Sequence, residues 1–243
     1  SGQASFKDYL KPINNIQFNF QDVDNETVIK IIDGMKPKTS FGHDGLSMKL
    51  IKSIKTEIAP SLCLIINQML HTGIFPEKLK IAKVLPFFKK GDIHIFANYR
   101  PISLLPAVSK IFEKVIFTQL YTYFQTKQLF YSSQYGFRSR HSTELAALEL
   151  IDRIIKDMDK MEFPLNIYLD LSKAFDTLNH TILLHKLKHY GVTGTGLKLF
   201  SSYLEKRTQY VEYDGVSSQT RSITTGVPQG SVLGPLLFII YIN

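Results

Sequence analysis

The stretch Tyr168-Leu-Asp-Leu-Ser-Lys-Ala-Phe-Asp176 gives the strongest indication of the fold. Residues 165–171 are almost continuously apolar, which predicts a strand that other elements cover on both faces. Apolar side chains then recur at helical spacing over residues 175–190, so we expect a helix there. A buried strand would thus end at Asp170 and run into a helix.

Asp170 has two interpretations at the end of such a strand. A buried carboxylate is unfavourable unless it is paired or binds a cation, which favours a metal site. The alternative is an aspartate at a helix N-terminus, stabilised by the helix dipole and by the neighbouring Ser172. Two Mg²⁺ ions require carboxylates from separate segments, and no other Asp or Glu stands at a comparable strand end. For Asp176, inside the expected helix, a structural hydrogen bond or ion pair is favoured over metal ligation.

A second informative stretch is Gly226-Val-Pro-Gln-Gly-Ser-Val-Leu-Gly-Pro-Leu-Leu-Phe238, a glycine-proline turn that leads into an apolar helix from about Ser231. Glycines let the backbone pass close to a ligand, and Gln229 can both donate and accept hydrogen bonds. Backbone amides at the start of the following helix favour anions. A plain turn without a ligand is the competing interpretation.

Composition limits the class of protein. The chain has 243 residues, 44% of them hydrophobic, which suits one large domain or two subdomains that share a core. The single cysteine, Cys63, excludes an internal disulfide and a zinc site built from cysteines. The apolar stretch 232–242 is too short for a bilayer, which takes roughly 20 residues, so no membrane partner is expected. The net charge of +8 favours a polyanionic partner.

Further elements and basic groups lie along the rest of the chain. We expect a strand over 83–88, helices over 108–124 and 142–158, and a hairpin that turns at Asp214-Gly215. Mixed helices and strands with long crossings indicate an α+β fold. Two basic groups are interleaved with aromatic residues that could stack on bases, although ordinary solvated loops are the alternative. Their members are Lys89, Lys90, Arg100, Arg138, Arg140 and His141, with Tyr99, Tyr135 and Phe137 between them.

The order and spacing of the segments resemble the reverse transcriptases of non-LTR (LINE-type) retrotransposons over nearly the whole chain. The matching segments are Gly42-His-Asp-Gly45, Lys83-Val-Leu-Pro-Phe-Phe-Lys-Lys-Gly-Asp92, Asn98-Tyr-Arg-Pro-Ile-Ser-Leu-Leu105, Gln134-Tyr-Gly-Phe-Arg138 with His141-Ser-Thr143, and the two stretches quoted above. The resemblance implies a right-hand polymerase fold, with an N-terminal extension and fingers over 1–165 and a partial palm over 166–243. The family's aromatic-x-Asp-Asp hairpin and thumb are not among these 243 residues.

The resemblance also implies roles for particular residues. Asp170 is similar to the first catalytic, metal-binding aspartate, with the Leu171 carbonyl beside it. Phe175 resembles the steric gate that packs on the sugar and disfavours a 2′-hydroxyl. The residues implied to contact the nucleotide are Lys89 or Lys90, Arg100, Gln229 and Gly230, and those implied to contact the template are Gly136, Phe137 and Arg138.

The implied activity is templated DNA synthesis with an RNA template, a DNA primer or target, dNTPs and two Mg²⁺ ions, in the nucleus or cytoplasm. Because the chain starts at Ser1 and contains one of the required carboxylates, we expect a fragment that is inactive alone. A non-catalytic remnant that binds nucleic acid or a protein is the alternative. A viral RNA-directed RNA polymerase is a third interpretation, against which Phe175 argues.

Overall fold

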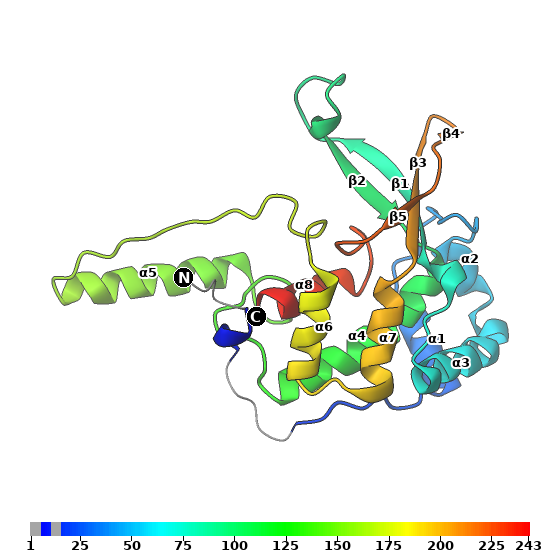
Figure 1. Ribbon diagram of the computed structural model, residues 1–243, viewed down its shortest axis with the longest axis horizontal. Helices are drawn as coiled ribbons and strands as arrows, with labels where there is room; N and C mark the ends of the chain where they lie inside the picture. The colour runs from blue at the N-terminus through cyan, green and yellow to red at the C-terminus, as the bar shows by residue number, and fades with distance from the viewer. Residues whose placement is uncertain (1–5, 11–15) are drawn as a thin grey trace.

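The computed structural model describes residues 6–10 and 16–243 and has a mixed α/β architecture (Figure 1). This agrees with the expected mixture of helices and strands. The α-helices are α1 (Asn25–Gly34), α2 (Met48–Ser53), α3 (Lys55–Thr72), α4 (Ala107–Thr126), α5 (Thr143–Asp159), α6 (His180–His189), α7 (Gly194–Leu204) and α8 (Gly234–Ile242). Short 3₁₀ helices lie at Phe6–Tyr9, Glu77–Lys80 and Phe96–Asn98.

A small mixed sheet stands on one side of the helices (Figure 1). Its strands are β1 (Ile81–Phe88), β2 (Tyr99–Leu104), β3 (Arg207–Tyr213), β4 (Val216–Ser217) and β5 (Arg221–Ile223). β1 pairs antiparallel with β2 and parallel with β3, and β3 also pairs antiparallel with β4 and β5. The far ends of β1 and β2 project from the body as a hairpin arm.

Local signals in the sequence explain where several elements begin and end. Asp214 and Gly215 have φ values of 49° and 75°, and the antiparallel pair Tyr213 and Val216 flanks them, so the expected hairpin turn is confirmed. Gly73 ends α3 in the left-handed conformation with φ 66°, as its place after the apolar run predicts. Ser142 caps α5 by accepting a hydrogen bond from the Leu145 amide.

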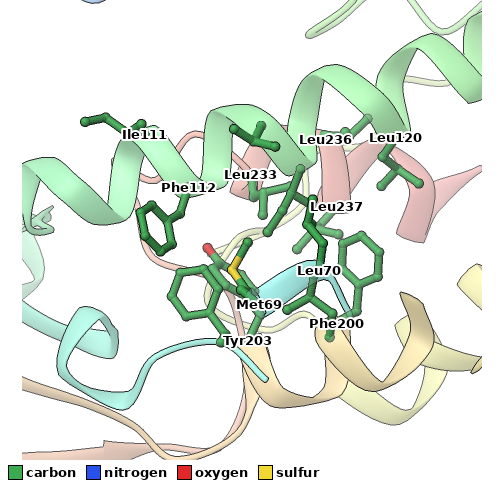
Figure 2. Close-up of a cluster of buried hydrophobic side chains, with 14 of the residues drawn as sticks. Met69, Leu70, Ile111, Phe112, Leu120, Phe200, Tyr203, Leu233, Leu236 and Leu237 are labelled. Atoms are coloured by element: carbon green, nitrogen blue, oxygen red, sulfur yellow. The ribbon is translucent and has the colours of Figure 1, made fainter. Parts of the chain in front are cut away.

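The core lies where α3, α4, α7 and α8 meet (Figure 2). Side chains from four parts of the sequence pack there, including Met69, Phe112, Phe200 and Leu237, each at most 2% exposed. α8 is apolar on all sides, and five of its nine residues are buried. Within the described ranges, no helix is both long enough and apolar enough to cross a membrane.

The predicted strand over 165–171 is wrong for this structure. These residues form an extended segment without strand pairing, and Leu165, Ile167 and Leu169 are 85%, 75% and 87% exposed. A strand with two apolar faces forms only when neighbouring strands and covering helices are at hand, and the segment instead crosses open space after α5 (Figure 1). α5 itself has no buried residue although its sequence is strongly amphipathic.

The predicted helix over 175–190 begins later than expected. Residues 172–177 form turns, Lys173 has a φ of 51°, and α6 starts at His180. The Asn179 side chain accepts a hydrogen bond from the Ile182 amide at 3.1 Å and so fixes the start of the helix. Asp176 therefore lies in a turn before the helix.

Candidate nucleotide and template site

The 172–177 turn and the 225–230 loop are joined by backbone hydrogen bonds. The Gly226 amide donates to the Leu178 carbonyl at 2.8 Å, and the Val227 amide donates to the Phe175 carbonyl at 2.9 Å. The His180 ring also lies 2.7 Å from the Gly226 carbonyl. The structure therefore brings together the two stretches that the sequence singled out, although neither is helical at the point of contact.

Gln229 links this pair of segments to the sheet. Its side-chain amide donates to both carboxylate oxygens of Asp176, at 3.1 and 3.2 Å. Its carbonyl accepts a hydrogen bond from the Ser103 amide of β2 at 2.9 Å. The structural interpretation of Asp176 is thus confirmed, since its carboxylate orients Gln229. Three distant parts of the sequence meet at one glutamine.

Two glycines permit this close approach. A Cβ at Gly226 would lie 2.6 Å from the Asp176 carbonyl oxygen, and a Cβ at Gly230 would lie 2.6 Å from the Ser103 carbonyl oxygen. Both residues also have positive φ, 78° and 123°. Glycine is therefore required at each position by conformation and by space.

Gly226→Ala is expected to lower the free energy of unfolding by about 2–4 kcal/mol, because left-handed strain and a backbone clash add. Gly45→Ala is the matched control, since Gly45 has a φ of 72° but a Cβ added to it would meet no atom within 4 Å. The control should lose only about 1–2 kcal/mol, the conformational part. Urea unfolding of both variants measures the difference, and equal losses would show that the close approach contributes nothing.

Phe175 lies in an aromatic cluster beside this junction. Its ring centroid is 4.9 Å from that of Phe238 in α8 and 5.8 Å from that of Phe137. Phe137 is 54% exposed, so it forms the open side of the cluster. The structure thus brings one residue of the expected template element next to the expected sugar-packing residue.

Arg138 is held within its own loop. Its guanidinium donates to the carbonyls of Tyr131 and Gln134, at 3.0 and 3.3 Å, and lies over the Phe130 ring at 5.2 Å. The Gly136 carbonyl accepts a hydrogen bond from the Gln134 side chain at 3.0 Å. These contacts give Arg138 a role in shaping the loop that presents Phe137.

Lys89, Lys90 and Arg100 lie on the hairpin arm, apart from the junction. All three are exposed, and none forms an ion pair with another described residue. Arg100 is opposite Phe87 and stands three residues before Ser103 on β2, a separation of about 10 Å along a strand. The arm therefore presents positive charge beyond the Gln229 contact.

Asp170 and Leu171 are on the exposed segment before the turn. In the part of the chain that the structure describes, no three His, Cys, Asp or Glu side chains gather as metal ligands. Magnesium is usually held by one or two carboxylates together with waters and substrate phosphates. Asp170 is a single accessible carboxylate.

Glu113 was not predicted from the sequence to have any special role. It is fully buried in α4, and its carboxylate accepts hydrogen bonds from the amides of Val232 at 2.6 Å and Leu233 at 3.2 Å and from the Ser109 hydroxyl at 3.2 Å. The expected preference of the amides at this helix start for an anion is therefore seen at these two residues. An internal carboxylate occupies them. The available signal in the sequence was a carboxylate directly after Phe112, in a helix with a strong apolar pattern.

Arg207 and Tyr203 complete a buried polar cluster with Glu113. Arg207 is fully buried, donates to the Tyr203 carbonyl at 3.1 Å and lies over the Tyr203 ring at 4.8 Å. Burial raises the pKa of the Glu113 carboxyl, although the Arg207 charge and the Leu233 and Val232 amides oppose this shift. Burial also raises the pKa of the Tyr203 hydroxyl, and the nearby Glu113 charge adds to it. The cluster connects α4, α7 and β3 to the loop that carries Gln229.

Comparisons with known proteins agree on one family. The family described as "Reverse transcriptase (RNA-dependent DNA polymerase)" matches residues 88–243. The chain is 32% identical over 236 residues to the RNA-directed DNA polymerase from mobile element jockey of Drosophila melanogaster, covering 97% of the chain and 26% of that relative. It is 33% identical over 223 residues to the probable RNA-directed DNA polymerase from transposon BS of the same organism, covering 89% and 24%. The chain spans about a quarter of the length of these relatives.

Proposed function

The chain belongs to the reverse transcriptase (RNA-dependent DNA polymerase) family, and we propose that it supplies the fingers and part of the palm of a retrotransposon enzyme. It is homologous to the RNA-directed DNA polymerases of the non-LTR elements jockey, BS and X-element. The proposed reaction is the addition of dNTPs to a DNA primer or target along an RNA template. We propose fingers over 1–165 and palm over 166–243.

The junction at Gln229 is the observation that carries the proposal. Its hydrogen bonds fix Phe175, Asp176 and Gly230 relative to β2. This supports a surface of fixed geometry against which a base pair and its sugar pack. Phe175 is proposed to pack on the sugar and to exclude a 2′-hydroxyl. Gln229 and Gly230 are proposed to contact the nucleotide, with the Gln229 side chain held ready by Asp176.

The hairpin arm is proposed to bind the triphosphate. Lys89 or Lys90 and Arg100 are exposed, and no ion pair with another described residue has to break before they contact phosphate oxygens. Phe137 is proposed to stack on a template base, with Gly136 and Arg138 shaping its loop.

Asp170, with the Leu171 carbonyl beside it, is proposed as the carboxylate that this chain contributes to catalysis. Reverse transcriptases generally use divalent metal ions, and bound Mg²⁺ would stabilise charge on the reacting phosphate. Further ligands have to join Asp170, because Mg²⁺ takes waters and substrate phosphates beside its carboxylates and two ions require carboxylates from separate segments. We propose that residues 165–171 become a strand when the remainder of the palm supplies their neighbours. An intracellular site of action, in nucleus or cytoplasm, is part of the same proposal.

Primer extension on an RNA template tests the proposal. A longer protein that contains this chain and the rest of the palm is expected to extend a DNA primer with dNTPs and to use NTPs at least about a hundredfold less efficiently, a difference of roughly 2.7 kcal/mol. The 243-residue chain alone is expected to give no extension, because its one candidate carboxylate stands on an unpaired segment. A longer protein that binds nucleic acid without extension would favour a non-catalytic remnant. Preference for NTPs would favour an RNA polymerase.

A further inference from the structure

The carboxyl group of Glu113 is a buried ionisable group to which the proposed reaction gives no role. It lies in α4 at 0% exposure, and the adjacent Phe112 and Leu233 belong to one apolar cluster (Figure 2). Its Oε2 accepts hydrogen bonds from the amides of Val232 at 2.6 Å and Leu233 at 3.2 Å. A side chain of α4 therefore holds the backbone a short distance beyond Gln229.

Hydrogen bonds inside the loop 226–233 connect this anchor to Gln229. The Ser231 hydroxyl donates to the Pro228 carbonyl at 2.9 Å and accepts from the Gly234 amide at 3.0 Å. The Ser231 amide donates to the same Pro228 carbonyl at 3.1 Å. These residues form one hydrogen-bonded unit, in which a displacement at the α8 end would also move Gln229.

The rest of the loop is fixed by other elements. The Val227 amide donates to the Phe175 carbonyl at 2.9 Å, and the Gln229 carbonyl accepts from the Ser103 amide at 2.9 Å. Gly230 lies so close to β2 that a Cβ on it would be 2.6 Å from the Ser103 carbonyl oxygen. If the α8 end shifts while these contacts hold, the loop has to deform at Gln229 and Gly230.

The length of the Glu113 side chain brings its Oε2 to the loop. The Ser109 hydroxyl, one turn earlier in α4, donates to Oε1 at 3.2 Å and so fixes the orientation of the carboxyl group. Aspartate is shorter by one carbon–carbon bond of about 1.5 Å, so the contact with the Val232 amide would open to about 4 Å, beyond hydrogen-bond distance. Glutamine keeps the length and removes the charge. The two substitutions therefore separate reach from charge.

We propose that Glu113 is a positioning residue for the incoming nucleotide, which it serves by fixing the loop that carries Gln229 and Gly230. This inference rests on the proposed function, since both loop residues are assigned there to the nucleotide. A misplacement of about 1 Å in a group that positions the substrate can cost about a hundredfold in rate. A residue that only stabilised the fold would change the amount of active enzyme and leave the KM for dNTP as it is.

The test compares the dNTP kinetics of Glu113→Asp and Glu113→Gln in a longer protein that contains this chain and the rest of the palm. Glu113→Asp is expected to raise the KM for dNTP about tenfold, while the affinity for primer and template stays unchanged. Glu113→Gln should stay much closer to the unaltered KM, because its carbonyl oxygen can replace Oε2. Ile116→Val is the matched control, since it removes a methyl group from the same buried helix without removing a hydrogen-bonding group. The control should lower stability and leave the KM unchanged.

A double-mutant cycle shows whether Glu113 acts through the loop. In a Gln229→Ala background, Glu113→Asp should raise the KM by much less than tenfold, because the side chain that it positions is gone. Amide hydrogen exchange on the 243-residue chain provides a readout without catalysis. Glu113→Asp should speed exchange at Val232 and Leu233 more than Ile116→Val does, because these amides lose their acceptor.

Several outcomes would overturn the positioning role. They are an equal KM in Glu113→Asp and Ile116→Val, an equal rise in Glu113→Asp and Glu113→Gln, an undiminished effect in the Gln229→Ala background, and equal amide exchange in Glu113→Asp and the control. If Glu113→Asp does not fold, Ser109→Ala removes only the group that orients the carboxyl, and it should still raise the KM about threefold. A longer protein that extends no primer in any form would refute the proposed function itself. An active protein whose KM is unchanged by Glu113→Asp refutes the positioning role alone.

Discussion

Asp170→Asn in a longer protein that contains the remaining palm should abolish primer extension, with a loss of at least about a thousandfold, or roughly 4 kcal/mol of transition-state stabilisation. Asparagine keeps the size of the side chain and removes the negative charge that a metal-binding carboxylate must provide. Because Asp170 is exposed and its segment is unpaired, the change should leave the folding of the described chain unaffected.

Asp159→Asn is the matched control for this experiment. Asp159 is an exposed aspartate at the end of α5, so its replacement removes the same charge from a surface position outside the candidate site. Extension rates on an RNA template, together with thermal unfolding of both variants, separate catalysis from stability. Extension by the Asp170 variant at a rate near that of the control would remove Asp170 from the catalytic assignment.

Glu113→Ala should lower the free energy of unfolding by about 3–5 kcal/mol, since the buried carboxyl group accepts hydrogen bonds from three donors and an unsatisfied buried donor costs about 1–3 kcal/mol. These donors are the amides of Val232 and Leu233 and the Ser109 hydroxyl, and alanine offers none of them an acceptor. Small domains have only about 5–15 kcal/mol of stability, so this loss is a large share. The loop that carries Gln229 should become sensitive to proteolysis before the rest of the chain.

Glu113→Gln is a more conservative substitution, and it also tests how the contribution of Glu113 to stability depends on pH. Both amides donate to the same oxygen, Oε2, which the glutamine carbonyl oxygen can replace, while the oxygen that accepts from the Ser109 hydroxyl becomes an NH₂ group, so the expected loss is about 1–2 kcal/mol. Burial raises the pKa of Glu113 above its ordinary value of 4.5, so the folded state holds the proton more tightly than the unfolded state. The stabilisation is therefore complete below the unfolded pKa and declines as pH rises through the folded pKa.

The stability advantage of the unaltered chain over Glu113→Gln should accordingly shrink as pH rises above about 4.5, and urea unfolding at several pH values measures it. Gln125→Ala, an exposed substitution in the last turn of α4, serves as the control and should change stability by no more than about 0.5 kcal/mol. An advantage that grows with pH would contradict the assignment of a raised pKa to Glu113.

Short-range signals in the sequence are sufficient to predict several elements of the fold. Asp-Gly predicts the hairpin turn at residues 214–215 because both residue types tolerate the left-handed conformation, which both adopt in the structure. Gly73 predicts the end of α3 for the same reason. The long helix α4 follows from its apolar periodicity. The family follows from the order and spacing of the quoted motifs, because each motif is contiguous in the sequence.

Contacts that join distant segments depend instead on how the whole chain packs. The contact of Gln229 with Asp176 and Ser103 joins residues that lie far apart in the sequence, and no local pattern specifies it. The burial of Glu113 beneath α8 likewise depends on how α4 packs. The failure of the 165–171 strand has the same cause: an apolar run becomes a strand only when other segments provide hydrogen-bond partners and cover both of its faces.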